Sequence, residues 1–266
     1  MLDPFKRQIN YLRISVTDRC NLRCRYCIPE KGIKFMSAED ILSFEEIYDF
    51  VKVAVDSGIH KVRLTGGEPL VRKGIVQLVE MLASIPGIKD LGMTTNGILL
   101  NRFAGDLVKA GLNRVNISLD SLDAGNFHYI TRVGKLENVL DGIKTAQKAG
   151  LSPVKINCVV KDKGLDENAV KVKAFGKKNG MQVRFIKEMD LESGVFSVVK
   201  GGDGGKCHIC NRLRLTPDGF LKPCLFSEVG YNIREYGYRE ALELAVGNKP
   251  ERGSLNNINN FYNIGG

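Results

Sequence analysis

The chain has 266 residues, enough for one sizeable α/β domain with its own core and a small appendage. Its formal net charge of +9 favours an anionic partner such as a polyphosphate, a nucleic acid or a membrane surface, although no run of five like charges marks a basic tail. The N-terminus has no apolar signal region, and no apolar run is long enough to span a membrane, so we expect a cytoplasmic protein.

One unit recurs between residues 12 and 188: a segment with helical periodicity, a glycine that ends it, and a short β-rich run. Glycine suits the left-handed position that ends many helices. The alternation predicts parallel strands joined by right-handed helical crossovers. The helix-ending glycines are Gly58, Gly87, Gly111, Gly150 and Gly180, and the predicted strands are 12–16, 61–65, 90–94, 114–119, 154–160 and 182–187.

Three cysteines follow the first strand with three and then two residues between them: Cys20, Cys24 and Cys27. A short loop with thiolates at these intervals can bind three of the four irons of a cubane iron–sulfur cluster. The fourth iron then stays open for a substrate or cofactor, which indicates a catalytic site. The same spacing would also suit three small apolar residues on one buried helix face, but Pro29 and Gly32 leave little room for a helix.

The predicted strands alternate apolar and polar residues, whereas a fully buried parallel sheet has continuous apolar runs. With helices on the apolar face, the polar face would line the wet, basic cavity of a partial barrel, with catalysis at the C-terminal ends of the strands. A half-exposed sheet with one solvated face would show the same alternation. Four cations on the polar face favour a polyphosphate ligand: Arg13, Arg63, Lys155 and Arg184.

The repeat stops after Glu188, where a Gly-, Ser- and Val-rich connector begins. A second set of three cysteines follows it: Cys207, Cys210 and Cys224. Pro217-Asp218-Gly219 indicates a turn between two short strands that would bring these thiols together. A second open cluster is one interpretation; a zinc knuckle is the other, with His208 or an outside group as the fourth ligand. Cys158, in a strand-like run, is expected to be a small core residue.

Over nearly its whole length the chain resembles the GTP 3′,8-cyclases of molybdenum cofactor biosynthesis, a family of radical S-adenosylmethionine (SAM) enzymes. The second cysteine motif, with Arg212 and Arg214 directly after it, is the most specific part of the resemblance. The other matching stretches are Leu12-Arg-Ile-Ser-Val-Thr-Asp-Arg-Cys20-Asn-Leu-Arg-Cys24-Arg-Tyr-Cys27-Ile-Pro, Arg63-Leu-Thr-Gly-Gly-Glu-Pro-Leu, Thr94-Thr-Asn-Gly, Asn116-Ile-Ser-Leu-Asp, Lys155-Ile-Asn and the final Gly265-Gly266.

The resemblance implies an α/β fold, a partial (βα)6 TIM-like barrel of the radical SAM type. Residues 1–188 would form the barrel, 189–206 a shortened connector, and 207–266 a small C-terminal region that binds an auxiliary iron–sulfur cluster. The Gly265-Gly266 tail would reach into the active site. Relatives usually have a connector several dozen residues longer, so the way the cavity is closed could differ here.

The resemblance also assigns roles to individual residues. One [4Fe-4S] cluster would be held by Cys20, Cys24 and Cys27, and a second by Cys207, Cys210 and Cys224. SAM would contact Tyr26, Gly67, Ser118 and Met189. GTP would contact Arg13, Arg63, Thr94, Lys155, Arg184, Arg212 and Arg214. In the family, SAM is cleaved to a 5′-deoxyadenosyl radical that abstracts the ribose 3′ hydrogen; the ribose radical then attacks C8 of guanine, which leads to 3′,8-cyclo-7,8-dihydroguanosine 5′-triphosphate.

The expected partners are GTP, an electron donor such as a flavodoxin or ferredoxin, and a cyclic pyranopterin monophosphate synthase that takes the product. A monomer or homodimer is expected, with no membrane or nucleic-acid partner. One alternative is a related two-cluster radical SAM enzyme that acts on another substrate such as a peptide. A zinc-binding nucleic-acid protein would need aromatic residues among its cations, but the chain has no Trp and its strand cations are expected to face inward.

Overall fold

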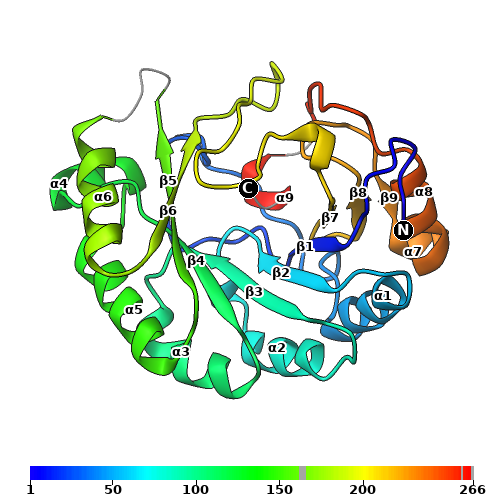
Figure 1. The fold of residues 1–266 in the computed structure, drawn as a ribbon, viewed down its shortest axis with the longest axis horizontal. Helices are drawn as coiled ribbons and strands as arrows, with labels where there is room; N and C mark the ends of the chain where they lie inside the picture. The colour runs from blue at the N-terminus through cyan, green and yellow to red at the C-terminus, as the bar shows by residue number, and fades with distance from the viewer. Residues whose placement is uncertain (162–165, 259, 265–266) are drawn as a thin grey trace.

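The computed structural model describes residues 1–161, 166–258 and 260–264 (Figure 1). Six parallel strands form an arc with helices along its outer side, as the alternating pattern predicts. The strands are β1 (Tyr11–Ser15), β2 (Lys61–Thr65), β3 (Asp90–Thr95), β4 (Arg114–Ser118), β5 (Val154–Val160) and β6 (Gln182–Lys187). The main helices between them are α1 (Phe44–Asp56), α2 (Ile75–Ala83), α3 (Leu100–Lys109), α4 (Ala124–Thr131), α5 (Leu136–Ala149) and α6 (Glu167–Lys178), with a short 3-10 turn η1 (Pro69–Val71) after β2.

The helix ends follow the signals in the sequence. Ser43 caps α1 with a complete capping box, in which its side chain accepts from the Glu46 amide and the Glu46 carboxylate accepts from the Ser43 amide. All five glycines expected to end helices have positive φ, between 65° and 104°. Strand bounds agree with the sequence to within one residue; β1 starts one residue early, at Tyr11. The crossover from β4 to β5 contains two helices, α4 and α5, where the repeat predicted one unit.

The C-terminal strands extend the barrel sheet rather than form a separate layer. β7 (Arg212–Leu215) pairs in parallel with β1 and places Arg214 opposite Arg13. β8 (Phe220–Lys222) and β9 (Tyr231–Asn232) continue the sheet antiparallel, with the expected turn between β7 and β8. Across the described residues the strand order is β6-β5-β4-β3-β2-β1-β7-β8-β9. The remaining elements are η2 (Cys207–Ile209), α7 (Ile233–Tyr236), α8 (Tyr238–Gly247) and α9 (Phe261–Ile264).

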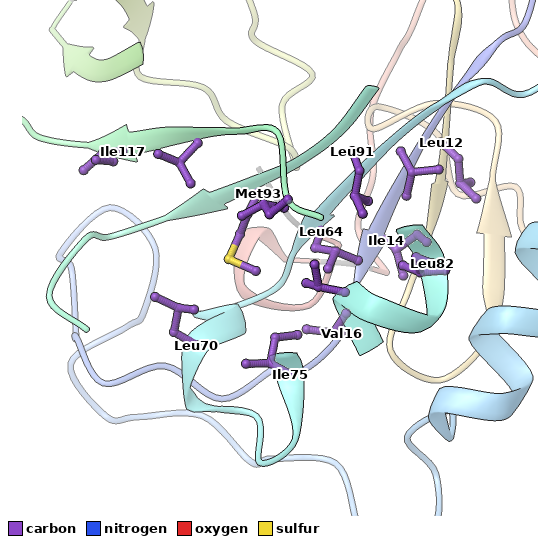
Figure 2. Packing of buried hydrophobic residues seen from close by; sticks show 14 of the residues in the cluster. Leu12, Ile14, Val16, Leu64, Leu70, Ile75, Leu82, Leu91, Met93 and Ile117 are labelled. Atoms are coloured by element: carbon purple, nitrogen blue, oxygen red, sulfur yellow. The ribbon is translucent and has the colours of Figure 1, made fainter. Parts of the chain in front are cut away.

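The hydrophobic core lies between the outer face of the sheet and the helices (Figure 2). Leu12, Ile14 and Leu64 point outward from β1 and β2 and are fully buried, while Ile75 and Leu82 of α2 pack toward them. Each such side chain contributes about 1.5–3 kcal/mol through burial of apolar surface. Because the apolar residues occupy alternate strand positions, the intervening polar residues must face the interior of the arc.

The packing of α3 against α5 depends on the missing side chain of Gly142. A Cβ atom there would lie 2.2 Å from the Gly97 carbonyl oxygen. We therefore expect Gly142→Ala to lower the free energy of unfolding by about 1–3 kcal/mol through overpacking. Gly105, in the interior of α3, is the matched control, because a Cβ atom there meets nothing within 4 Å.

Gly105→Ala is expected to raise stability by about 0.5–1 kcal/mol, since alanine favours the helix. Denaturant unfolding of the cluster-free protein measures both changes. Equal effects of the two substitutions would contradict the close approach at Gly142.

Candidate active site

Two adjoining pockets lie on the inner side of the sheet, and each is lined by one set of three cysteines. The N-terminal pocket, of about 190 Å³, contains Cys20, Cys24 and Cys27. The C-terminal pocket, of about 250 Å³, contains Cys207, Cys210 and Cys224. Asn157, Ile186 and Met189 line both, so the two pockets share a wall. The expected basic cavity is therefore present, and the alternative of a solvated sheet face is wrong.

The first cysteine loop is held in an irregular conformation by the end of α4. Arg132, which follows that helix, donates to the carbonyl oxygens of Arg23 at 3.0 Å and Ile28 at 2.7 Å. The Arg23 amide donates back to the Thr131 carbonyl. Residues 20–27 form a loop with turns, as Pro29 and Gly32 indicated, and no helix. The loop thus receives its shape from contacts that leave the thiols facing the pocket.

Burial disfavours the thiolate form of these three cysteines. It raises the pKa of Cys20 to about 11 and that of Cys27 to about 12, and raises the pKa of Cys24 even further. Buried thiols that line one cavity become thiolates when a metal centre supplies positive charge. The donor set therefore fits a cysteine-ligated iron–sulfur cluster.

The four residues expected to contact SAM, namely Tyr26, Gly67, Ser118 and Met189, all line the N-terminal pocket. The Tyr26 hydroxyl donates to the Asp120 carboxylate at 2.9 Å, and the Val159 amide donates to the other oxygen of Asp120 at 2.8 Å. Burial raises the pKa of Asp120 to about 6 in spite of these two bonds. Sequence reasoning missed Asp120, although it lies two residues after the end of β4, at the edge where catalytic groups gather.

The glycine pair after β2 has a different immediate use from the expected one. Cβ atoms at Gly66 and Gly67 would lie 2.6 Å from the Thr17 carbonyl oxygen and 2.5 Å from the Arg19 carbonyl oxygen. The Gly67 amide donates to the Thr17 carbonyl at 2.8 Å. The glycines therefore let β2 pack closely against the segment that leads into Cys20, and Gly67 reaches the pocket as part of that packing.

Glu68 joins three loops at the C-terminal edge of the sheet. Its fully buried carboxylate accepts from the Thr95 hydroxyl at 2.7 Å, the Asn96 amide at 2.6 Å and the Leu70 amide at 3.0 Å. Asn96 in turn donates to Asn21 in the cysteine loop at 2.7 Å. Burial outweighs these bonds and raises the pKa of Glu68 to about 7.

The C-terminal pocket is lined by a group of cations from five strands. Five of the seven residues expected to contact GTP are here: Arg13, Arg63, Arg184, Arg212 and Arg214. Thr94 lines the N-terminal pocket instead, and Lys155 lines neither, although it interacts electrostatically with Arg184, Arg114, Lys61 and Arg63. Tyr11, Lys61 and Arg114 also line this pocket and were missed. The alternation along the strands could have identified these residues, because each begins its strand two positions before another residue that lines the pocket.

Only part of this positive charge is balanced inside the protein. Arg114 binds the Asp90 carboxylate through two nitrogens, at 2.6 and 2.5 Å, and Lys61 lies 3.4 Å from it. Arg63 donates to the Tyr11 hydroxyl at 2.7 Å. Burial would raise the pKa of Tyr11, but Arg13, Arg63 and Lys61 outweigh it and lower the pKa to about 7.

Some buried guanidinium nitrogens on the pocket side of the sheet make no hydrogen bond to the described residues. Among the described residues, Arg63 Nη1 and Arg184 Nε have no hydrogen-bond partner. Unsatisfied buried donors on guanidinium groups are costly, and a phosphate group can satisfy them with strong charged hydrogen bonds. The pocket therefore fits an anionic, phosphate-bearing ligand.

The second cysteine set lies beside these cations. Burial acts to raise the pKa of Cys210, but Arg212 and Lys249 lower it to about 7. A Cβ atom at Gly253 would lie 3.1 Å from the Cys224 sulfur, so glycine keeps the space next to that thiol open. Among the described residues, no three His, Cys, Asp or Glu side chains converge closely enough to hold a single metal ion. Three thiols around one cavity, with this space beside them, fit a larger cluster.

The expected Gly265-Gly266 tail lies outside the described residues. Phe261 in α9, just before it, lines the N-terminal pocket, and α9 lies inside the arc of the sheet (Figure 1).

None of the helices in the described ranges is long and apolar enough to cross a membrane.

Comparison with known proteins gives one consistent result. Residues 14–173 match the Radical SAM superfamily. A GTP 3′,8-cyclase of Thermodesulfovibrio yellowstonii is 46% identical over 282 aligned positions, which cover 88% of this chain and 87% of that protein. One of Petrotoga mobilis is 42% identical and covers 94% of each chain. The first alignment is longer than this whole chain, so the relative contains residues that this chain lacks.

Solved structures share the fold at low sequence identity. SuiB of Streptococcus suis superposes with a TM-score of 0.65 at 15% identity, over 91% of this chain and 66% of that one. Methylornithine synthase (PylB) gives 0.56 at 18% identity, over 76% of this chain and 61% of that one. These likenesses describe the fold alone.

Protonation of Glu68 is expected to show in the pH dependence of stability. Its pKa is raised from 4.5 to about 7 by folding, so its contribution to stability is full below pH 4.5 and is lost as the pH rises through 7. The unfolding free energy of the wild type relative to Glu68→Gln should therefore fall by about 2–3 kcal/mol over this range.

Glu46 provides a control of opposite sign. The hydrogen bonds from Arg234 lower its pKa, so the wild type should lose stability relative to Glu46→Gln as the pH falls. Denaturant titrations of the cluster-free protein from about pH 3 to pH 8 measure both, because the loss at Glu46 falls mostly below pH 4.5 and the loss at Glu68 above it. A difference between wild type and Glu68→Gln that stays constant with pH would contradict the raised pKa.

Proposed function

The chain belongs to the GTP 3′,8-cyclase family of the radical SAM superfamily, and from this membership we propose that its two pockets convert GTP to 3′,8-cyclo-7,8-dihydroguanosine 5′-triphosphate. The observation that carries the proposal is the adjacency of a three-cysteine pocket and a cationic three-cysteine pocket across a shared wall. Such a wall would bring the ribose of a nucleotide in one pocket close to SAM in the other.

In the N-terminal pocket, Cys20, Cys24 and Cys27 would hold a [4Fe-4S] cluster, and SAM would bind beside it. When bound, the cluster would supply the electron for the reductive cleavage of SAM. The protein's part is to position SAM and exclude water. Tyr26, Gly67, Ser118 and Met189 are assigned to SAM because they line this pocket. Asp120 fixes the Tyr26 hydroxyl, so the ring is held at the pocket wall.

In the C-terminal pocket, the guanidinium groups that line the wall bind the triphosphate, and Cys207, Cys210 and Cys224 hold a second cluster next to the guanine. Arg13, Arg63, Arg184, Arg212 and Arg214 are assigned to GTP on this basis. Thr94, which lines the N-terminal pocket, and Lys155, which interacts electrostatically with Arg184 and Arg63, are assigned to GTP from the family pattern. Bidentate guanidinium–phosphate pairs would fix the nucleotide in one orientation.

Each part of the chain has its own role in this proposal. Residues 1–188 would carry the SAM half, 207–266 the auxiliary cluster and the tail, and 189–206 would close the C-terminal pocket between them. An electron donor such as a flavodoxin or ferredoxin, and a cyclic pyranopterin monophosphate synthase that consumes the product, complete the proposed reaction sequence, with the enzyme as a monomer or homodimer.

The test is an anaerobic assay of the cluster-reconstituted protein with SAM, a strong reductant and GTP. Mass spectrometry follows 5′-deoxyadenosine and the cyclised nucleotide together. Both products forming in step support the cyclase. 5′-Deoxyadenosine without any product from GTP would overturn it and favour a radical SAM enzyme with another substrate, such as a peptide.

Loss of one thiol from the N-terminal pocket should abolish SAM cleavage. We expect Cys24→Ala to release about half of the bound iron and to reduce 5′-deoxyadenosine to background, because the open cluster needs all three thiolates. Cys158, which is buried in the core away from both sets, is the matched control. Cys158→Ala should retain iron and cleavage. Normal SAM cleavage by Cys24→Ala would remove that residue from the cluster.

Loss of one phosphate-binding arginine should uncouple the two products. Arg212→Ala should weaken GTP binding by about 10–100-fold, as expected for a lost charged hydrogen bond, while SAM cleavage continues. The control is Arg239→Ala, on the exposed surface of α8. GTP titrations that follow both products measure the effect. Wild-type yields of cyclised nucleotide at low GTP would contradict the assignment of Arg212.

A further inference from the structure

The second cysteine set is spread over two separate segments of chain. Cys207 begins the 3-10 turn η2 and Cys210 ends it, with the Cys210 amide donating to the Cys207 carbonyl at 3.0 Å, whereas Cys224 follows β8. Sheet pairing fixes β7 and β8 themselves, but the described residues 207–211 and 223–224 lie outside the strands. Contacts outside the sheet must therefore hold the turn and Cys224 relative to each other.

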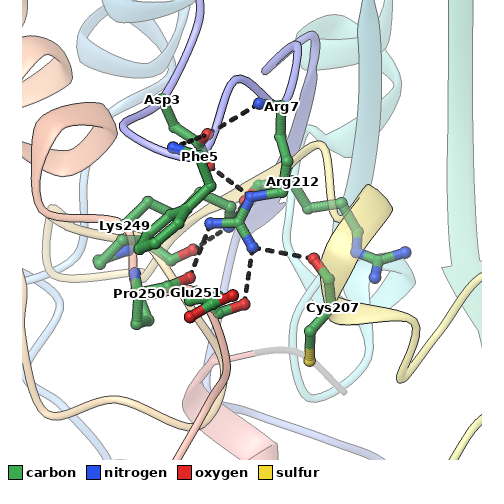
Figure 3. Close-up of polar contacts among 9 residues, drawn as sticks. Asp3, Phe5, Arg7, Cys207, Arg212, Lys249, Pro250 and Glu251 are labelled. Atoms are coloured by element: carbon green, nitrogen blue, oxygen red, sulfur yellow. Dashed lines mark hydrogen bonds and ion pairs between the residues drawn. The ribbon is translucent and has the colours of Figure 1, made fainter.

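Two buried cations tie these segments to one stretch of backbone, residues 249–251 (Figure 3). Lys249 is 2% exposed, and its ammonium group donates to the Arg212 carbonyl at 2.7 Å and also to the Pro223 carbonyl. Arg212 lies two residues after Cys210, and Pro223 directly precedes Cys224. The Lys249 side chain thus links the segments that carry two of the three cysteines.

Arg7 makes the corresponding link to the start of the turn, at Cys207. Its guanidinium group donates to the Cys207 carbonyl at 2.8 Å, and to the carbonyls of Glu251 at 2.9 Å and Pro250 at 2.7 Å (Figure 3). Asp3 orients it through a 2.6 Å ion pair in which the carboxylate is fully buried. Because Pro250 and Glu251 directly follow Lys249, both cations act on the same stretch of backbone.

The two cations differ in their charge balance. Arg7 is paired with the Asp3 carboxylate, whereas both hydrogen-bond acceptors of Lys249 are backbone carbonyls. Among the described residues, no ion pair joins Lys249 to a carboxylate, and it interacts electrostatically with Cys210 and Cys224. A buried positive charge next to cluster thiolates stabilises the reduced, more negative cluster more than the oxidised one.

We propose that Lys249 and Arg7 are positioning residues for the auxiliary cluster: together they hold the Cys207–Cys210 turn and the Cys224 segment in fixed relative positions, and Lys249 adds a buried charge that raises the reduction potential of the cluster. This inference rests on the second cluster of the proposed function. Neither residue belongs to the cysteine motifs, and both come from parts of the chain distant from Cys207–Cys224.

The test uses the full chain with Cys20, Cys24 and Cys27 all replaced by Ala, so that iron and the EPR signal report the auxiliary cluster alone. In this background, Lys249→Met should lower the iron content per chain and shift the midpoint potential of the remaining cluster to a more negative value. Lys249→Arg keeps the charge and should restore the potential toward that of Lys249.

Lys222 provides a matched control. It is also a buried lysine, 3% exposed, and donates to one backbone carbonyl, that of Glu228, at 2.8 Å. It lies nearer to Cys224 in sequence than Lys249 does, but its electrostatic neighbours are Asp218 and Glu228 and include no thiol. Lys222→Met should therefore lower thermal stability while it leaves the iron content and the potential unchanged.

The outcomes distinguish a failure of the positioning role from a failure of the second cluster itself. Lys249→Met with the wild-type iron content and potential, or Lys222→Met with an equal loss of iron, would overturn the positioning role. Absence of iron from the background protein with Lys249 intact would overturn the second cluster itself, and the inference with it. Arg7→Met, which removes the link to Cys207, should lower the iron content with a smaller change in potential, because Asp3 already balances the charge of Arg7.

Discussion

The interior of this protein depends on one electrostatic constraint, the presence of guanidinium groups on the inner face of a sheet where burial disfavours charge. Burial lowers the pKa of Arg13, Arg184 and Arg214, the last to about 9, because a positive charge in this interior costs free energy. Asp90 balances Arg114 and Lys61, and the Tyr11 hydroxyl accepts from Arg63.

The inner face of the sheet keeps positive charge that Asp90 and Tyr11 do not balance, and this excess charge suits the pocket to an anion. A folded interior with excess positive charge is stabilised by an anion that binds the folded state and not the unfolded chain. Gly92 contributes to this arrangement on β3, because a Cβ atom there would lie 3.3 Å from Arg63 and 3.4 Å from Arg114. One strand position without a side chain thus provides room for two arginines.

Much of the fold and of the site could be predicted from the sequence because both follow short-range rules. The alternation along β1 and β2 separates core from cavity, helix-ending glycines mark the crossovers, and the spacing around Cys24 indicates a loop that binds a cluster. Contacts between segments that are far apart in the sequence could not be predicted from such rules. Lys249 looks like an ordinary lysine after a helix, and Arg7 like part of a basic N-terminus, until the fold brings them beside Cys207 and Cys224.

The parallel pairing of β7 with β1 was also beyond short-range reasoning, since residues 212–215 are about 200 positions from residues 11–14. That pairing has a functional consequence: it sets Arg214 opposite Arg13 and carries the second cysteine set to the open side of the barrel. The close approach of Gly66 to Thr17 was beyond short-range reasoning as well, because it joins segments that are about 50 positions apart.

The length of the segment between β6 and Cys207 is consistent with this geometry. From the end of β6 to Cys207 the chain has about 20 residues and could extend over about 65 Å, whereas the five strand spacings from β6 back to β1 amount to about 25 Å. This segment therefore has spare length. Part of it lines the C-terminal pocket, where Phe196 stacks on Phe226, and Gly201 packs against the Val183 carbonyl at the edge of the sheet. Because both sets of cysteines and the pocket arginines belong to the sheet and its flanking loops, their positions depend little on the length of this segment.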